Sequence, residues 1–228
     1  MPATLNLLAD NIWEITHPLS VAGMQLGHRM TVVRLASGDL WVHSPVALDP
    51  ILQTELAQLG PMQYLIAPNT FHDLYWQPYF AAYTDARFCC APGFQESHGK
   101  LSFTDTLDDN APDAWAQDID QLVVAGVPRF NETVFLHKAS GTLIAADLAF
   151  NVVSDVGAYT RFMLTLTGTN GHFAASRLFK AFIKDAAAMR RSIDQILAWD
   201  FDRILVGHGE VLESGGRKKL EDTYSFLK

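Results

Sequence analysis

Residues 202–209 read DRILVGHG, an apolar run that ends at a histidine between two glycines. The branched apolar residues from Ile204 to Val206 are typical of a short buried strand. Gly207 and Gly209 let the backbone at the end of this strand approach its neighbours closely. A histidine at such a point either makes a hydrogen bond within the turn or takes part in a site, so we treat His208 as a candidate site residue.

Two other apolar segments also end in polar residues. Residues 63–75 read QYLIAPNTFHDLY, and His72 and Asp73 follow the apolar part. Residues 142–151 read TLIAADLAFN, and Asp147 follows the apolar part. Ligands of open α/β sheets bind beyond the carboxyl ends of strands, so these three residues join His208 as candidates.

Each of these carboxylates also has a purely structural explanation. Asp73 precedes a predicted helix that begins near Leu74, and Asp147 precedes another segment, so either residue is a candidate N-cap. His72 and Asp73 also form a candidate catalytic pair, in which the carboxylate orients the imidazole while the imidazole binds metal or acts as a base.

The remaining periodicity predicts alternating strands and helices in one domain over residues 1–228. The predicted strands are 11–16, 30–35, 40–46, 63–67, 86–91, 119–125, 133–137, 142–146 and 204–206. The predicted helices are 50–59, 74–83, 173–199 and 220–227, with an irregular segment at 150–170. No Pro-, Gly- or Ser-rich linker divides the chain, so we expect two packed sheets with helices outside.

The composition excludes several partners. The net charge is −8, with 17 Lys and Arg against 25 Asp and Glu, which does not resemble a nucleic-acid-binding surface. Apolar runs are too short to span a membrane, and we expect no membrane partner. The start of the sequence, MPATLNLLADNIW, lacks the features of a signal peptide. The adjacent Cys89 and Cys90 suit a reducing compartment. These two observations together predict a cytoplasmic protein.

The order of these three segments, PNTFHDLY, AADLAFN and DRILVGHG, resembles the metallo-β-lactamase superfamily. The resemblance implies a fold of the α/β (α+β) class, a four-layer αββα sandwich of two mixed sheets flanked by helices. It covers nearly the whole chain. In that superfamily a first strand ends in an HxHxDH loop, a later strand ends in a metal-bridging Asp, and a last strand ends in a His.

The resemblance implies ligand positions that this chain fills only in part. Asp73, Asp147 and His208 match the loop Asp, the bridging Asp and the final His. Other positions depart from the pattern: Asn69 and Phe71 stand at the first two His positions, Leu74 stands at the last, and no His occurs near residues 127–129. His72 lies beside the expected positions. The predicted metal ligands are therefore His72, Asp73, Asp147 and His208, which suits one ion better than two.

Two function classes follow from this depleted motif. The first is a hydrolase that holds one divalent transition metal, for which zinc is preferred over iron or manganese. A water molecule activated by this metal would attack an ester- or lactone-like bond of a small molecule. Asn69 and His28 are then candidates for substrate binding. The alternative is a non-catalytic binding protein of the same fold that has lost its metal centre and carries none. A diiron redox relative is a third, weaker interpretation, and the sequence does not set the oligomeric state.

Overall fold

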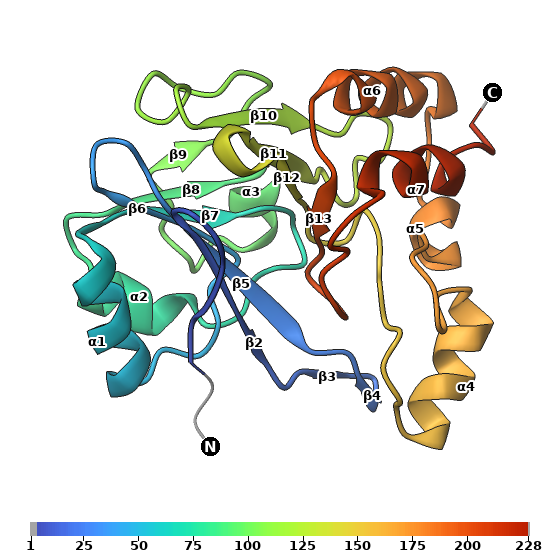
Figure 1. Ribbon diagram of the computed structural model, residues 1–228, viewed down its shortest axis with the longest axis horizontal. Coiled ribbons are helices and arrows are strands. Elements are labelled where there is room, and N and C mark those ends of the chain that lie inside the picture. The colour runs from blue at the N-terminus through green and yellow to red at the C-terminus, as the bar shows by residue number, and fades with distance from the viewer. Residues whose placement is uncertain (1–3, 228) are drawn as a thin grey trace.

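Two mixed β-sheets face each other in the computed structural model, which describes residues 4–227 (Figure 1). One sheet has seven strands in the order β1-β2-β5-β6-β7-β8-β9, and the other has four in the order β10-β11-β12-β13. The strands of the first are β1 (Asn6–Ala9), β2 (Ile12–His17), β5 (His28–Arg34), β6 (Leu40–His43), β7 (Met62–Ala67), β8 (Arg87–Cys90) and β9 (Asp105–Thr106). Those of the second are β10 (Ile119–Val123), β11 (Thr133–His137), β12 (Thr142–Ile144) and β13 (Arg203–Leu205). A separate hairpin joins β3 (Ser20–Val21) to β4 (Met24–Gln25).

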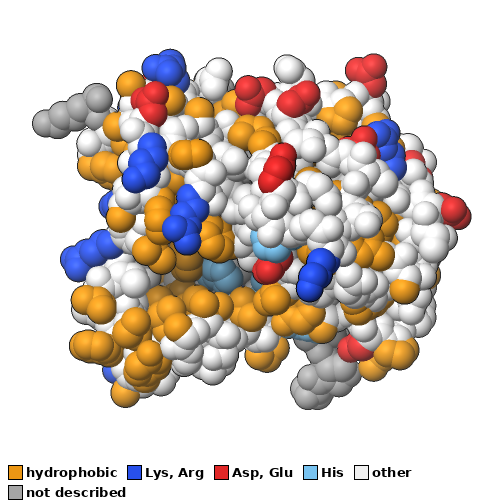
Figure 2. All heavy atoms as spheres, turned by 180° about the vertical axis from the view of Figure 1, so that it is seen from behind, with side chains coloured by type: hydrophobic (Ala, Val, Ile, Leu, Met, Phe, Trp, Pro, Cys, Tyr) orange, Lys and Arg blue, Asp and Glu red, His pale blue; other side chains and the backbone are white. Residues whose placement is uncertain are grey.

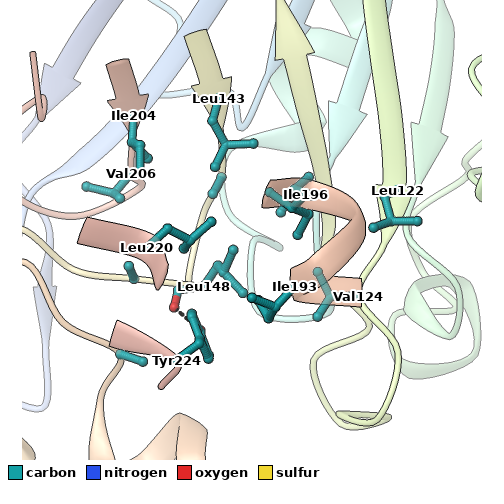
Figure 3. Close-up of a cluster of buried hydrophobic side chains, with 14 of the residues drawn as sticks. Leu122, Val124, Leu143, Leu148, Ile193, Ile196, Ile204, Val206, Leu220 and Tyr224 are labelled. Atoms are coloured by element: carbon teal, nitrogen blue, oxygen red, sulfur yellow. Dashed lines mark hydrogen bonds between the residues drawn. The ribbon is translucent and has the colours of Figure 1, made fainter. Parts of the chain in front are cut away.

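Helices cover the outer faces of both sheets. They are α1 (Pro50–Leu59), α2 (Trp76–Ala82), α3 (Phe94–Ser97), α5 (Arg177–Ala181), α6 (Ala186–Ala198) and α7 (Gly216–Thr223), with a 3₁₀ turn at Lys138–Ser140. Helix α4 (Ala158–Thr167) instead packs beside the β3–β4 hairpin. Apolar residues of α1, α2 and α3 pack on the seven-stranded sheet in one buried cluster. Figure 3 shows the matching cluster on the four-stranded sheet, where Ile193 and Ile196 of α6 and Leu220 of α7 meet Leu143 and Ile204.

A third apolar cluster fills the space between the two sheets. Trp41 of β6 faces this central layer and packs edge-on against Phe135 of β11, with ring centroids 4.9 Å apart. Its neighbours Leu40 and Val42 face the helices instead, as the two-residue period of a strand requires. The layers are thus helix, sheet, sheet and helix, which confirms the predicted αββα sandwich.

The beginning of α1 follows the sequence signals closely. Asp49 accepts a hydrogen bond from the backbone N–H of Leu52 at 2.8 Å, and Pro50 occupies the first helical position. Gly60 follows the last residue of the helix, as predicted.

Two of the predicted segments are wrong. The segment 150–170 is not irregular, because it contains α4 between Gly157 and Gly168. The helix predicted over 173–199 is divided into α5 and α6. Asp185 caps α6 by accepting the N–H of Ala188 at 2.8 Å. The carbonyl of Gly126 accepts the N–H groups of Lys184 and Asp185, so these two residues bond outside the helix and α6 begins after them. Within residues 4–227, none of the helices has the length and apolar character needed to cross a bilayer.

Candidate metal centre

Three candidate side chains come together because of where their strands end. β12 and β13 run parallel, with Ile144 opposite Leu205. Asp147 and His208 each lie three residues beyond this pair, so both follow the carboxyl ends of two neighbouring strands of the four-stranded sheet. His72 comes from the loop that follows β7 of the other sheet. The site therefore lies where the two sheets meet at the carboxyl ends of their strands.

The reactive atoms of these three residues converge on a small space. His72 Nε2 lies 3.5 Å from Asp147 Oδ2, and His208 Nε2 lies 3.4 Å from Asp147 Oδ1. One ligand atom from each residue lies within 4.8 Å of the other two, and all three residues are buried. The structure thus groups His72, Asp147 and His208 as a set that is positioned for a metal.

Contacts on the far side of each ring fix the orientation of the two imidazoles. His208 Nδ1 lies 2.6 Å from the carbonyl oxygen of Gly27, and because a carbonyl only accepts, Nδ1 carries the proton. His72 Nδ1 lies 2.5 Å from Ser44 Oγ, a hydroxyl that is able to donate or accept. Both rings therefore turn Nε2 toward Asp147, the arrangement in which metal-binding histidines are held by a second hydrogen bond.

Asp147 is held by two further buried residues. Asn69 donates from Nδ2 to Asp147 Oδ2 at 2.8 Å. Glu132 accepts the backbone N–H groups of Ala146 and Asp147 at 2.8 and 2.9 Å, which fixes the turn from which Asp147 projects. The carboxylate of Asp147 therefore has a defined direction without any metal.

Burial and mutual charge shift the pKa values of this cluster. Burial alone would raise the pKa of Asp147, but His208 and His72 together hold it well below its usual value. Burial works against the charged form of His208, yet the Asp147 carboxylate raises its pKa overall. Burial and the nearby Asp147 carboxylate both raise the pKa of Glu132. Asp147 is thus the anion of the site.

The other predicted site residues have different positions. Asp73 lies outside the group, because its carboxylate points to His98 with Oδ2 3.3 Å from Nε2, and its side chain is 40% exposed. The structure offers no geometric support for Asp73 as a ligand or catalytic partner of His72. Asn69 shapes the loop, since its Oδ1 accepts the N–H groups of Phe71 and His72 at 2.8 and 3.2 Å.

His28 lies beside the group and is buried. Its ring centroid is 5.1 Å from that of His72, and its Nε2 lies 3.1 Å from the carbonyl oxygen of Pro45. Burial, with the neighbouring His72 and His208, lowers the pKa of His28 to about 3, so the ring is neutral. Its predicted role in substrate binding remains a prediction.

Sequence reasoning missed Glu132 and Ser44. Glu132 precedes β11 without any motif, and its link to Asp147 spans 15 residues, so no local pattern identifies it. Ser44 lies inside the strand predicted over 40–46, but β6 ends at His43, and Ser44 adopts a φ of 55°. A left-handed backbone at a serine is uncommon and redirects the chain next to His72.

A large cavity opens beside the three side chains. Its volume is about 590 Å³, within the range of pockets that hold small molecules. Apolar residues dominate its wall: Leu19, Val21, Met24, Leu26, Phe71, Leu74, Phe130, Phe150, Leu164, Leu178, Phe179 and Phe182. His28, His72, Asp147 and His208 lie at its polar end. Figure 2 shows histidine side chains in this hollow, surrounded by hydrophobic side chains.

The donor set and its spacing fit one metal ion. Two imidazoles and one carboxylate are a common set for catalytic zinc, which leaves one position open. Metal–ligand bonds of about 2.0–2.2 Å in a tetrahedron separate the ligand atoms by roughly 3.3–3.5 Å. The two histidine nitrogens lie 3.5 and 3.4 Å from different oxygens of Asp147, and one ligand atom from each residue lies within 4.8 Å of the other two, so small shifts would bring the three atoms to this spacing.

A family model described as a domain of unknown function, DUF4336, matches residues 9–192. The chain belongs to the DUF4336 family. No curated protein matches the chain. The matched range includes His72 and Asp147 but ends before His208, so the family model covers only part of the candidate centre.

Solved structures with the same architecture are metallo-β-lactamases and a flavodiiron core. A metallo-β-lactamase from Erythrobacter litoralis has a TM-score of 0.70 at 11% identity, with 99% of this chain and 97% of that chain covered. One from Hirschia baltica has a TM-score of 0.67 at 10% identity, with coverage of 99% and 97%. The metal-soaked Flv1 flavodiiron core from Synechocystis has a TM-score of 0.68 at 10% identity, with coverage of 98% and 60%. At such identities the likeness establishes the metallo-β-lactamase fold, which confirms the predicted resemblance.

Proposed function

We propose that the chain is a metal-dependent hydrolase with one divalent metal held by His72, Asp147 and His208. The convergence of these three buried side chains at the end of an apolar cavity carries the proposal. A bound divalent metal acidifies water and polarises a carbonyl group, which is the chemistry that hydrolysis of an ester or lactone requires. Zinc suits the donor set best, with iron and manganese as alternatives.

The protein's own residues prepare the site for this reaction. Gly27 and Ser44 turn the two imidazoles, while Asn69 and Glu132 aim the carboxylate of Asp147. Side chains that are already oriented lose less conformational entropy when a metal ion binds to them.

The cavity indicates an uncharged, apolar substrate. Its wall is mostly aliphatic and aromatic, and Arg129 is the basic residue among the lining residues that the structure describes. The guanidinium of Arg129 lies 4.6 Å from the ring centroid of Phe182, at the wall and not beside Asp147. We infer that an ester or lactone with an apolar acyl group enters this cavity, with its carbonyl toward the histidines.

Metal content tests the proposal directly. Protein purified without added metal is analysed for zinc, iron and manganese by elemental mass spectrometry. We expect about one ion per chain. The His208→Ala and Asp147→Ala variants lose the ion, while His172→Ala, which removes an exposed histidine, keeps it. Esters and lactones with apolar acyl groups are then assayed with the loaded protein.

An opposite result identifies the alternative function. A chain that contains no metal, and whose melting temperature does not rise with zinc, iron or manganese, has no such centre, because a ligand of the native state must stabilise it. The Asp147 carboxylate already accepts a hydrogen bond from Asn69 Nδ2 at 2.8 Å, which does not depend on an ion. That outcome favours a non-catalytic protein that binds a small apolar molecule in the same cavity.

A further inference from the structure

Helix α4 exposes a stripe of large apolar side chains. Tyr159, Phe162 and Leu166 are 53%, 64% and 56% exposed, and their spacing of three and four residues places them on one face. The buried residues of α4 are Thr160 and Leu164, on the opposite face. A soluble helix ordinarily exposes its polar face, so this orientation indicates contact with another apolar phase.

The stripe continues around the mouth of the cavity. Leu178 of α5 is 59% exposed and also lines the cavity. Val21, at the end of β3, is exposed and lines the cavity too, and the neighbouring carbonyl of Ala22 accepts a hydrogen bond from the Tyr159 hydroxyl at 3.0 Å. We call Val21, Tyr159, Phe162, Leu166 and Leu178 the apolar rim.

The segment that carries most of the apolar rim is less acidic than the rest of the chain, although Asp155 and Asp185 adjoin it. Residues 156–184 contain four Lys and Arg residues and no Asp or Glu, in a chain whose net charge is −8. Arg161 forms an ion pair with Asp155. Among the described ion pairs, none involves Arg177, Lys180 or Lys184. Figure 2 shows hydrophobic side chains at the lower left, over α4, with Lys and Arg side chains nearby.

We propose that the apolar rim docks on an anionic lipid surface. Exposed Phe, Tyr and Leu with flanking Lys and Arg are what a protein uses to lie on anionic headgroups without crossing the bilayer. The acidic remainder of the chain is repelled by such a surface, which orients the rim toward it. The expectation of no membrane partner considered only spanning segments, and this docking needs none.

A second copy of the chain fits the same surface less well. A two-fold contact would place the apolar rim of one copy against that of the other, and it would bring the Arg177, Lys180 and Lys184 side chains of both copies to the same contact. Like charges at a desolvated contact are unfavourable, whereas anionic headgroups neutralise them. Charge therefore favours the lipid over the dimer.

Docking in this orientation places the mouth of the cavity against the bilayer. Leu178 and Val21 belong both to the apolar rim and to the cavity wall, so an apolar molecule in the lipid has a path that avoids water. Docking itself does not depend on the metal centre. The His208→Ala chain is expected to bind lipid as the wild type does, which separates a failure of this proposal from a failure of the proposed hydrolase.

Flotation with vesicles tests the proposal. The full chain is mixed with vesicles of phosphatidylcholine alone, or of phosphatidylcholine with phosphatidylglycerol, and the fraction that floats is measured. We expect binding to the anionic vesicles that is at least about tenfold stronger than to the neutral ones, and that weakens in about 1 M salt. The Lys180→Glu/Lys184→Glu variant loses the anionic preference, and Phe162→Ser/Leu166→Ser loses binding to both kinds of vesicle.

Matched variants on other faces serve as controls. Leu7→Ser removes an equally exposed leucine from β1, and Lys100→Glu reverses an exposed charge outside residues 156–184, so both are expected to bind like the wild type. Circular dichroism melts show whether each variant is folded. The salt dependence of wild-type binding tests the proposal without any variant. Equal binding to both vesicles, no binding at all, or a dimer in light scattering that Phe162→Ser/Leu166→Ser dissolves would overturn the proposal.

Discussion

The buried carboxylate of Glu132 accepts the backbone N–H of Asp147 at 2.9 Å, so one acid holds the backbone from which the other projects. Its second oxygen accepts the N–H of Ala146 at 2.8 Å. Glu132 comes from the segment before β11, whereas Asp147 follows β12, and the two strands are neighbours in the sheet. The position of the candidate ligand is therefore fixed from the adjacent strand.

Replacing Glu132 with alanine is expected to destabilise the fold. The N–H groups of Ala146 and Asp147 lose their acceptor in a buried place, and each unsatisfied group costs about 1–3 kcal/mol. We expect the free energy of unfolding in urea to fall by about 2–4 kcal/mol. The exposed Glu221→Ala, the control, changes it by less than about 0.5 kcal/mol. Equal stability of Glu132→Ala and wild type would show that the turn does not need this carboxylate.

Ser44→Ala is expected to weaken metal binding. The hydroxyl is the partner of His72 Nδ1, and loss of such a partner of a metal-bound histidine typically lowers affinity about 10–100-fold. Competition with a chromophoric chelator measures the change in zinc affinity. Ser97→Ala removes an exposed hydroxyl that bonds only within its own helix, and it leaves the affinity unchanged. Unaltered zinc affinity in Ser44→Ala would mean that Ser44 does not orient His72.

Gly209→Ala is expected to disrupt the backbone beside His208. Gly209 has a φ of +91°, and an added Cβ would lie 2.3 Å from the carbonyl oxygen of Asn151. Gly171, with a φ of +75° and no neighbour within 4 Å of an added Cβ, makes a matched control. Gly171→Ala then measures conformational strain alone, about 1–2 kcal/mol. Gly209→Ala is expected to exceed that loss by at least about 2 kcal/mol in the same urea unfolding, and equal losses would refute the contact.

His43 is expected to make the fold sensitive to acid. Burial, and then the nearby His72 and His28, lower its pKa well below the usual value, so the folded chain keeps the ring neutral while the unfolded chain protonates it near pH 6.5. The unfolded state thus binds more protons as pH falls below about 6.5, and stability declines toward the folded-state pKa.

The His43→Leu variant measures this contribution. One titrating group accounts for at most about 1.4 kcal/mol per pH unit, so the variant should lose less stability between pH 6 and pH 4 than the wild type does. The Nε2 atom of His43 has no hydrogen-bond partner in the described structure, so leucine removes no bond of that atom at neutral pH. His172→Leu, at an exposed position, keeps the wild-type slope. Identical slopes for all three chains would contradict the prediction.

The positions of Asp147 and His208 after strands were predictable from sequence, because each is a polar residue that follows an apolar run. That pattern also made Asp147 and His208 candidates for a site at the carboxyl ends of strands. The direction of the Asp73 side chain was not predictable, since neither neighbour in sequence fixes its contact with His98. The break between α5 and α6 depends on the carbonyl of Gly126, and the role of Glu132 depends on strand pairing. Contacts between distant segments decide both features, and local periodicity does not record them.

Part of the cavity wall comes from two helices that lie, in the sequence, between the strands that carry Asp147 and His208. Leu164, Thr167, Leu178 and Phe179 of the wall lie on α4 and α5, between the strands whose ends carry Asp147 and His208. Substitutions at these positions would therefore reshape the wall while the three converging side chains stay on unchanged strands, although Leu164 and Phe179 are also buried in apolar clusters. A library built there would test which small molecules the cavity accepts.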